Sequence, residues 1–270
     1  MKIAGSRILL TGATGGIGRA LAPELARRGA RLALAGRDTN RLARLAGEIS
    51  NAAAPAVSLP SDLARPGSHA ELVRCAHESL GGIDVLINNA GRSRFSAFAG
   101  EDEAALRDLI EVNVTAPLLL ARAALPHLLQ RGTGCIVNIG SVFGAIGFPY
   151  HAAYSATKFA LRGFSEALRR ELADSGVKVL YIAPRATATA MNGPAARALM
   201  ADTGTAVDAP EKVAVAIADA LAGDRQEVTL GGPERIFVRL NALLPGIVDA
   251  SLVKQGRIAA HHLLESKAAK

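Results

Sequence analysis

The stretch ILLTGATGGIGRALAPELARRG, residues 8–29, decides the fold. It opens with an apolar strand, turns through Thr11–Gly18 and continues as a helix. Gly12 permits the tight turn, Gly16 lets the backbone approach a pyrophosphate, and Gly18 lets the helix pack on the sheet. Phosphates bind well at the start of a helix, where free N–H groups and the helix dipole favour negative charge. The stretch therefore predicts a dinucleotide-binding turn.

Apolar runs and helical segments alternate along the rest of the chain. Such alternation predicts parallel strands joined by right-handed crossovers, and near-continuous apolar runs indicate strands covered on both faces. We therefore predict an α/β fold, a doubly wound Rossmann fold with a seven-stranded parallel sheet and helices on both faces, whose ligand lies beyond the carboxyl ends of the strands. The expected strands are Arg7–Leu10, Arg31–Ala35, Ala56–Leu59, Val85–Asn88, Cys135–Ile139, Val177–Ile182 and Glu227–Leu230. The expected helices are Ile17–Arg28, Asn40–Ile49, His69–Leu80, Glu103–Leu129, Ala152–Leu172 and Pro210–Ala222.

The end of the second strand bears on which dinucleotide binds. NAD sites place a carboxylate here for the ribose hydroxyls, whereas NADP sites place an arginine near the 2′-phosphate. Asp38 is positioned for the first role and Arg37 for the second. Gly36 leaves a gap beside Arg37, and Arg41 lies one helical turn further on. The sequence favours NADP(H), with NAD(H) as the alternative.

Further cofactor contacts are expected after the first, third and fourth strands. Asp62, next to Leu63, can accept a hydrogen bond from the adenine amino group, and Asn88–Gly91 ends the fourth strand where the adenosine ribose would lie. The same residues also suit ordinary turns. The expected contacts in these three segments are Gly12, Thr14, Gly15, Gly16, Ile17, Gly18, Asp62, Leu63, Asn89, Ala90 and Gly91.

The segment Tyr154-Ser155-Ala156-Thr157-Lys158 places a phenol and an ammonium on one face of a helix. A phenol with a pKa of about 10 is a poor base at neutral pH, but a neighbouring ammonium lowers that pKa. The pair therefore suits proton transfer to or from an alcohol oxygen. Ser141, just past the fifth strand, can hydrogen-bond the same oxygen.

With these motifs the sequence resembles the short-chain dehydrogenase/reductase family, in its compact single-domain branch, over roughly Ile3 to Gly231. Thr11–Gly18 is similar to the cofactor loop of the family, and Asn88–Gly91 is similar to its structural Asn-Asn-Ala-Gly motif. Asn113, Ser141, Tyr154 and Lys158 match its catalytic tetrad.

The resemblance implies a role for each member of the tetrad. Tyr154 would transfer the proton, and Lys158 would lower the Tyr154 pKa and hold the nicotinamide ribose. Ser141 would orient the carbonyl, and Asn113 would hold a water in a proton relay to Lys158. Hydride would pass between nicotinamide C4 and the substrate carbon, with no metal required.

The connection after the sixth strand departs from the family pattern. The family usually has Pro-Gly here and a Thr four residues beyond the Gly, whereas Arg185 replaces the glycine in this chain. Arg185 points outward, touches the cofactor, or presents a cation to an anionic substrate, and the sequence leaves these alternatives open. Thr189 can meet the nicotinamide carboxamide. The cofactor contacts expected here are Pro184, Arg185, Thr187 and Thr189.

A chain of 270 residues, half of them hydrophobic, fits one large α/β domain. We expect a Rossmann-type dinucleotide-binding and catalytic domain over residues 1–232, and a helical C-terminal extension of the same domain over residues 233–270. Apolar residues in the extension suggest amphipathic helical turns that Pro245-Gly246 interrupts. The connection Pro184–Val207 is long for a loop, and loops of this length often form lids.

Composition argues against several other kinds of site. Lys and Arg are scattered despite a net charge of +7, so no nucleic-acid role is expected. Cys75 and Cys135 lie outside any Cys pair or Cys/His cluster, so we expect neither a metal site nor a disulfide. The first apolar stretch stops at Thr11-Gly12, too early for a signal peptide, and no uninterrupted apolar run approaches the ~20 residues of a membrane helix. The expected location is the cytoplasm.

The sequence thus predicts an NADP(H)-dependent oxidoreductase that interconverts a carbonyl, in a ketone or aldehyde, and an alcohol. The alternatives are an NAD-linked alcohol dehydrogenase and a catalytically silent dinucleotide-binding sensor or scaffold. Ser141–Tyr154 and the Pro184–Val207 connection should build the substrate pocket, whose Phe143, Ile146, Phe148 and Pro149 suit a lipophilic substrate.

Two further expectations concern partners. The long helices around Asn113 and Tyr154 resemble those that pair subunits in the family, which implies a homodimer or homotetramer. The segment after Gly231 carries six basic and three acidic residues beside its apolar stripe, a pattern compatible with contact between this tail and a membrane surface.

Overall fold

The computed structural model describes residues 1–52 and 54–268, and residues 269–270 of the expected C-terminal extension lie outside the described part. Seven parallel strands form one sheet in the order β3-β2-β1-β4-β5-β6-β7. This confirms the predicted doubly wound fold, and each predicted strand and helix ends within two residues of its observed end. The strands are β1 Arg7–Thr11, β2 Arg31–Gly36, β3 Ala56–Pro60, β4 Val85–Asn88, β5 Gly134–Ile139, β6 Val177–Ala183 and β7 Glu227–Thr229.

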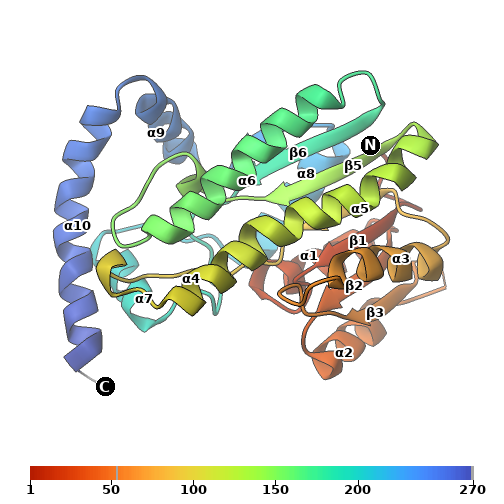
Figure 1. The fold of residues 1–270 in the computed structure, drawn as a ribbon, viewed down its shortest axis with the longest axis horizontal. Coiled ribbons are helices and arrows are strands. Elements are labelled where there is room, and N and C mark those ends of the chain that lie inside the picture. The colour runs from red at the N-terminus through yellow and green to blue at the C-terminus, as the bar shows by residue number, and fades with distance from the viewer. Residues whose placement is uncertain (53, 269–270) are drawn as a thin grey trace.

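Helices cover both faces of the sheet (Figure 1). One layer contains α1, α2 and α8, and the other contains α3, α5 and α6. The α-helices are α1 Gly16–Arg27, α2 Thr39–Ile49, α3 Ser68–Leu80, α4 Glu103–Ile110, α5 Ala116–Arg131, α6 Ala152–Glu171, α7 Pro194–Asp202, α8 Pro210–Ala222, α9 Gly232–Leu243 and α10 Pro245–Ala268. Short 3-10 turns occupy Phe98–Gly100 and Val142–Gly144.

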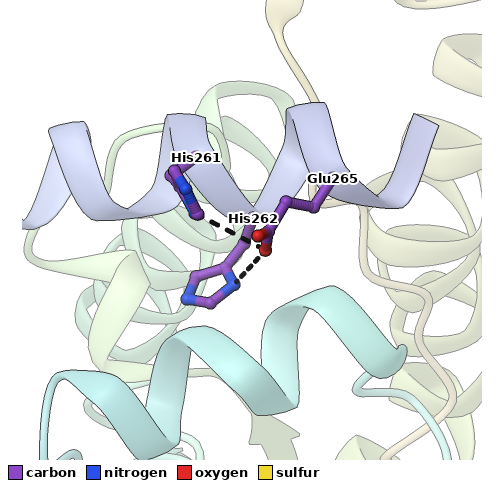
Figure 2. Close-up of side chains that lie close together, drawn as sticks. All are labelled: His261, His262 and Glu265. Carbon is purple, nitrogen blue, oxygen red and sulfur yellow. Dashed lines mark ion pairs between the residues drawn. The ribbon is translucent and has the colours of Figure 1, made fainter. Parts of the chain in front are cut away.

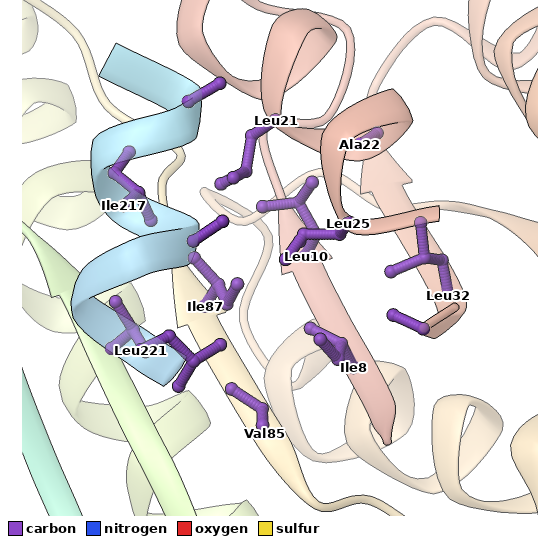
Figure 3. Packing of buried hydrophobic residues seen from close by; sticks show 14 of the residues in the cluster. Ile8, Leu10, Leu21, Ala22, Leu25, Leu32, Val85, Ile87, Ile217 and Leu221 are labelled. Atoms are coloured by element: carbon purple, nitrogen blue, oxygen red, sulfur yellow. The ribbon is translucent and has the colours of Figure 1, made fainter. Parts of the chain in front are cut away.

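Strand β1 shows how the alternation of side chains builds two cores. Ile8 and Leu10 point to one face, where Leu21 of α1 and Ile217 of α8 pack on them (Figure 3). Leu9 points to the other face and packs with the layer of α3 and α5. All three β1 side chains are fully buried. Because β1 lies between β2 and β4, the chain reverses its winding here, and the carboxyl ends of β1 and β4 open the crevice that such sheets use for ligands.

The helical stretch predicted over Glu103–Leu129 contains one irregular turn. Residues Glu111–Thr115 form a π-helical turn between α4 and α5. Pro117 has no N–H, so it cannot donate the α-helical hydrogen bond to the carbonyl of Asn113 four residues earlier. The turn therefore sits where the sequence removes a helical hydrogen bond, and turns of this kind recur at functional sites.

The same stretch, Glu103–Arg131, is long and apolar enough to cross a membrane by length and composition, with a mean hydropathy of 1.3 over its best window. In this fold 44% of that window is buried. Its inner side chains, among them Leu120 and Leu128, pack in the core between the sheet and α3. The packing of the α/β layer thus accounts for the apolar inner face of this helix.

The Pro184–Val207 connection, predicted as a loop, contains a helix. Pro194 occupies the first turn of α7, where its missing N–H costs nothing, and Ala196 and Leu199 are buried. The C-terminal extension is helical as predicted, and its break at Leu244 precedes Pro245, which starts α10. Helix α10 runs beside α7 and α9 at one end of the molecule (Figure 1).

Replacing Leu10 with alanine should destabilise the fold, because the side chain is fully buried at the centre of the sheet. We expect the free energy of unfolding to fall by about 2–5 kcal/mol, measured by urea denaturation. Leu243→Ala is the matched control, because Leu243 is 79% exposed, and it should change stability by less than about 0.5 kcal/mol. Equal losses in the two variants would contradict the central place of β1.

Candidate active site

The turn between β1 and α1 is held by contacts that leave no room for side chains. Gly12 has φ of +63°, and a Cβ there would lie 2.7 Å from Cα of Ala90. A Cβ on Gly16 would overlap Thr189, and one on Gly18 would overlap the carbonyl oxygen of Gly12. The spacing of these glycines thus reflects backbone contacts with the end of β4 and with the connection after β6.

Asn89 fastens this turn to the end of β4. Its Nδ2 donates to the carbonyl oxygens of Thr11 and Gly12, at 2.9 and 3.1 Å. The Thr11 hydroxyl in turn accepts hydrogen bonds from the backbone N–H groups of Asn89 and Ala90. The Asn89 side chain therefore supports the turn, while Gly91 faces the cavity described below.

Tyr154 and Lys158 lie on the buried side of α6 and are 9% and 6% exposed. The ammonium nitrogen of Lys158 lies 5.7 Å from the centre of the Tyr154 ring and donates to the carbonyl oxygen of Ile139, at 3.0 Å. Ser141, at the end of β5, hydrogen-bonds Tyr154. One helix and one strand end thus bring the hydroxyl, phenol and ammonium groups together, as the sequence predicted.

Burial determines the protonation of this pair. It raises the pKa of Tyr154 to about 12, against which the Ser141 hydrogen bond has a smaller, lowering effect. Burial also lowers the pKa of Lys158 to about 8. Desolvation is the largest cause of the Tyr154 shift, and the expected lowering of this pKa by the Lys158 ammonium stays a prediction.

Asn113 is held entirely by protein partners. Its Nδ2 donates to the carbonyl oxygen of Arg92 and to the hydroxyl of Thr157, and its Oδ1 accepts from the backbone N–H of Arg92. Gly91 lies between Asn113 and Lys158, since a Cβ there would be 3.4 Å from Asn113 Oδ1 and 3.7 Å from Lys158 Nζ. The side chain of Asn113 is thus fully engaged by Arg92 and Thr157.

A cavity of ≈ 380 Å³ joins the glycine turn to the polar group of α6. Apolar side chains form the wall away from the turn, including Phe143, Phe148, Leu199 and Met200. His151 belongs to this wall, and burial lowers its pKa to about 4, so the imidazole is neutral at physiological pH. The predicted site residues that line the cavity are Gly12, Gly15, Gly16, Ile17, Asn89, Ala90, Gly91, Ser141, Tyr154, Lys158, Pro184, Arg185, Thr187 and Thr189.

Two residues expected in the pocket wall lie elsewhere. Ile146 packs with Val248 of α10, and Pro149 lies against Gly256 of the same helix. In their place Met191 and Met200 line the cavity. These contacts connect the C-terminal extension to the back of the cavity wall.

Arg185 is paired with two carboxylates. Its Nε and Nη2 lie 2.8 and 2.9 Å from the two oxygens of Asp208, and its Nη1 lies 3.3 Å from Glu234. The guanidinium lowers the pKa of Asp208 to about 2, and both carboxylates raise the pKa of Arg185. This network, with Arg185 only 17% exposed and in the cavity wall, disagrees with an outward-pointing arginine. Contact with the cofactor and presentation of a cation to an anionic substrate stay predictions.

The end of β2 shows how Asp38 is used. Its Oδ1 accepts from the backbone N–H of Arg41, at 2.9 Å, and its Oδ2 lies 3.2 Å from Arg41 Nε. Asp38 is therefore the N-cap of α2. Arg37 is exposed beside it, close enough to Arg92 to lower the Arg92 pKa in addition to the larger effect of burial.

The remaining predicted contacts lie outside the cavity wall. Asp62 Oδ1 accepts from the N–H of Ala64 in a local turn, and the Leu63 side chain is buried in the core. Thr14 lies beside Gly36, at the end of β2.

Arg92 was not among the predicted site residues, but it lines the cavity and contacts Asp108. Its place directly after Asn88–Gly91, at the carboxyl end of β4, was an available signal.

A family model described as short chain dehydrogenase matches residues 6–199. "Dehydrogenase/reductase SDR family member 7B" of Bos taurus is 32% identical over 263 residues, which cover 93% of this chain and 81% of that protein.

Solved structures of the same kind match along most of the chain. A short-chain dehydrogenase from Sphingobium yanoikuyae in complex with NADPH is 32% identical with a TM-score of 0.77, covering 90% of this chain and 95% of that one. A short chain dehydrogenase/reductase from Burkholderia phymatum in complex with NAD is 25% identical with a TM-score of 0.81, covering 90% and 94%.

The buried lysine should make stability depend on pH. Between about pH 8 and its ordinary pKa of 10.5, Lys158 binds fewer protons in the folded than in the unfolded state. The contribution of Lys158 to stability should therefore rise with pH, by on the order of 2 kcal/mol between about pH 8 and 10. Lys158→Met should remove this rise, measured by urea denaturation at each pH. An equal rise in both proteins would show that Lys158 is charged in the folded state.

Proposed function

The chain belongs to the short-chain dehydrogenase family, and we propose that it is an NADP(H)-dependent oxidoreductase that interconverts a carbonyl and an alcohol by hydride transfer. One observation carries the proposal: Ser141, Tyr154 and Lys158 meet in the same cavity as the glycine turn. A dinucleotide and a small substrate can therefore be neighbours there.

The glycine turn fits the pyrophosphate of such a cofactor. Gly15 is the N-cap of α1 and has no side chain to cap it, and the first turn of the helix carries no acidic residue. Gly15, Gly16 and Ile17 line the cavity, so backbone N–H groups at the start of α1 are available to an anion. When bound, the nicotinamide would supply a hydride donor or acceptor at its C4 atom.

The protonation states of the buried pair favour reduction of a carbonyl. Tyr154, with a pKa of about 12, holds its proton at neutral pH and can give it to the oxygen of a reduced carbonyl. Ser141 can donate a hydrogen bond to the same oxygen and orient it. Lys158, with a pKa of about 8, can pass on a replacement proton near neutral pH. We propose that Asn113 holds a water for that transfer, as the family resemblance implies.

The preference for NADP(H) rests on Asp38 and Arg37. Asp38 caps α2 and pairs with Arg41, so its carboxylate is engaged away from the ribose hydroxyls that it would bind in an NAD site. Arg37 is exposed next to it and can meet a 2′-phosphate, with Arg41 nearby. Among the related structures, one is described with NADPH and another with NAD, so relatives alone do not decide the preference.

The cavity wall supports an apolar substrate. Phe143, Phe148 and Leu199 surround the space beyond Tyr154, and the neutral His151 adds no charge. The two arginines that line the cavity are both paired, Arg92 with Asp108 and Arg185 with Asp208 and Glu234. We therefore propose a neutral, lipophilic ketone or aldehyde as the substrate class.

A homodimer or homotetramer is part of the proposal. The outer surfaces of α4, α5 and α6 expose Ile110, Leu129 and Phe159, and α4 lies against α6. Residues 233–268 act with the main domain, because Val248 of α10 packs on Val142 and Ile146 behind the cavity.

Arg37→Ala should weaken NADPH binding while leaving NADH binding unchanged, because the arginine meets only the 2′-phosphate. Loss of a charge-assisted hydrogen bond predicts a rise in the NADPH dissociation constant of roughly 10- to 100-fold, followed by nicotinamide fluorescence. Arg44→Ala, on the exposed face of the following helix α2, is the charge-matched control and should bind NADPH as the wild type does. Tighter binding of NADH than of NADPH by the wild type would favour the NAD-linked dehydrogenase.

Tyr154→Phe should lower kcat for NADPH-dependent reduction by roughly 10²- to 10⁴-fold, with NADPH affinity unchanged. The measurement is NADPH oxidation with a panel of apolar ketones and aldehydes. Tyr150→Phe is the control, because it removes a phenol hydroxyl that is not among the groups lining the cavity. Tight cofactor binding without turnover of any substrate by the wild type would instead favour the silent sensor or scaffold.

A further inference from the structure

The C-terminal end of α10 brings two imidazoles and a carboxylate together (Figure 2). His261 and Glu265 are four residues apart and His262 and Glu265 are three apart, so both rings lie beside the carboxylate on one helix surface. Nδ1 of His261 lies 3.5 Å from Oε2 of Glu265, and Nδ1 of His262 lies 3.6 Å from the same oxygen. One donor atom from each residue lies within 4.8 Å of the other two.

These separations suit a metal ion better than direct hydrogen bonds. Hydrogen bonds between nitrogen and oxygen usually span about 2.7–3.2 Å. Ligand atoms about 2.0–2.1 Å from a tetrahedral Zn²⁺ lie roughly 3.3–3.4 Å from one another. Both measured separations lie within a few tenths of an ångström of that value. Two imidazoles and one carboxylate are also a ligand set that zinc uses in proteins.

We propose that His261, His262 and Glu265 bind one Zn²⁺ or a similar divalent transition metal, with water at the fourth position. The three donors all come from one turn of α10, so the site needs no rearrangement of the fold. The donor chemistry disfavours Mg²⁺ and Ca²⁺, which prefer oxygen ligands alone.

Asp202 supplies the support that metal-binding histidines usually have. Its Oδ2 accepts a hydrogen bond from Nε2 of His262, at 2.9 Å. With the proton on Nε2, the lone pair of Nδ1 is free for a metal, and the ring is held in orientation. The His262 side chain is only 11% exposed, which fixes its position further. Asp202 is therefore a positioning residue for the site.

The site links α10 to the wall of the cavity. Asp202 is the last residue of α7, and Ala196, Leu199 and Met200 of that helix line the cavity. A metal that fixes the His262 ring would also strengthen the hydrogen bond to Asp202 and restrain α7. Metal binding would thus restrict the motion of a segment that covers the substrate space, whichever substrate binds there.

Zinc titration of the full chain tests the site. The protein is prepared without a histidine tag, stripped with a chelator and titrated with Zn²⁺ in competition with a chromophoric chelator. We expect one equivalent to bind, and Glu265→Gln and His261→Gln each to weaken binding by more than about 10-fold. Asp202→Asn should weaken it by roughly 10- to 100-fold, as loss of a supporting carboxylate does.

His77→Gln is the matched control. His77 and His127 form a second pair of imidazoles, with ring centres 4.3 Å apart, far from α10 in sequence. This variant should keep wild-type affinity for zinc. Loss of binding in His77→Gln, unchanged affinity in Glu265→Gln, or equal affinity for Mg²⁺ and Zn²⁺ would each overturn the proposed site.

Amide hydrogen exchange separates metal binding from its effect on α7. Zinc should slow exchange in Pro194–Asp202 of the wild type and have less effect in Asp202→Asn at saturating metal. Unchanged exchange in the zinc-bound wild type would overturn the link to α7. Thermal midpoints of the metal-free variants should equal that of the wild type, because the substituted side chains are on the surface of helix ends and not in the core. None of these measurements depends on enzymatic turnover.

Discussion

The structure depends on close backbone contact at the turn between β1 and α1. Gly12 and Gly18 press this turn against the end of β4, where Asn89 and Thr11 hold it by hydrogen bonds. Gly16 does the same for the connection after β6, through Thr189. Three segments that are distant in sequence thus meet at one point, because none of the three glycines has a side chain that would hold the segments apart. The cavity and its polar groups are arranged around that point.

Burial sets the chemistry of the site. Tyr154 and Lys158 lose contact with water together, and their pKa values move in opposite directions, to about 12 and about 8. Both changes favour the neutral forms, because a buried phenol is more stable than a buried phenolate and a buried amine is more stable than a buried ammonium. Desolvation is the largest cause of both changes. The positive charge of an oxidised nicotinamide beside Tyr154 would act in the lowering direction, which is the direction that alcohol oxidation needs.

Much of the fold could be predicted, and so could the positions of the glycine turn and of Tyr154 and Lys158, because all of these depend on the spacing of residues that are near one another in the sequence. Apolar runs mark the strands, and the spacings around Gly12 and Tyr154 mark the two halves of the cavity. Features that join distant residues could not be predicted. The partners of Arg185 lie 23 and 49 residues away, and the pKa of Tyr154 depends on burial by several elements. Pro117 was a local signal for the π turn at Asn113, and Pro194 was one for the start of α7. Each proline shows where a helix becomes irregular or begins, but not which residues that helix contacts. The triad on α10 was not predicted, although the spacings of three and four residues that bring His261 and His262 beside Glu265 are a local pattern.

The connection after β6 is restrained at its two ends by interactions of different strength. Near its start, Arg185 binds Asp208 through two hydrogen bonds and Thr187 pairs with Asp208 through the backbone. Two-point, partly buried pairing of this kind resists motion more than a single exposed contact does. At the far end of α7, the hydrogen bond between Asp202 and His262 adds to the packing of α7 along α10. Because one hydrogen bond between side chains is weaker than the two-point pairing of Arg185 with Asp208, the C-terminal end of α7 should move first when the cavity opens.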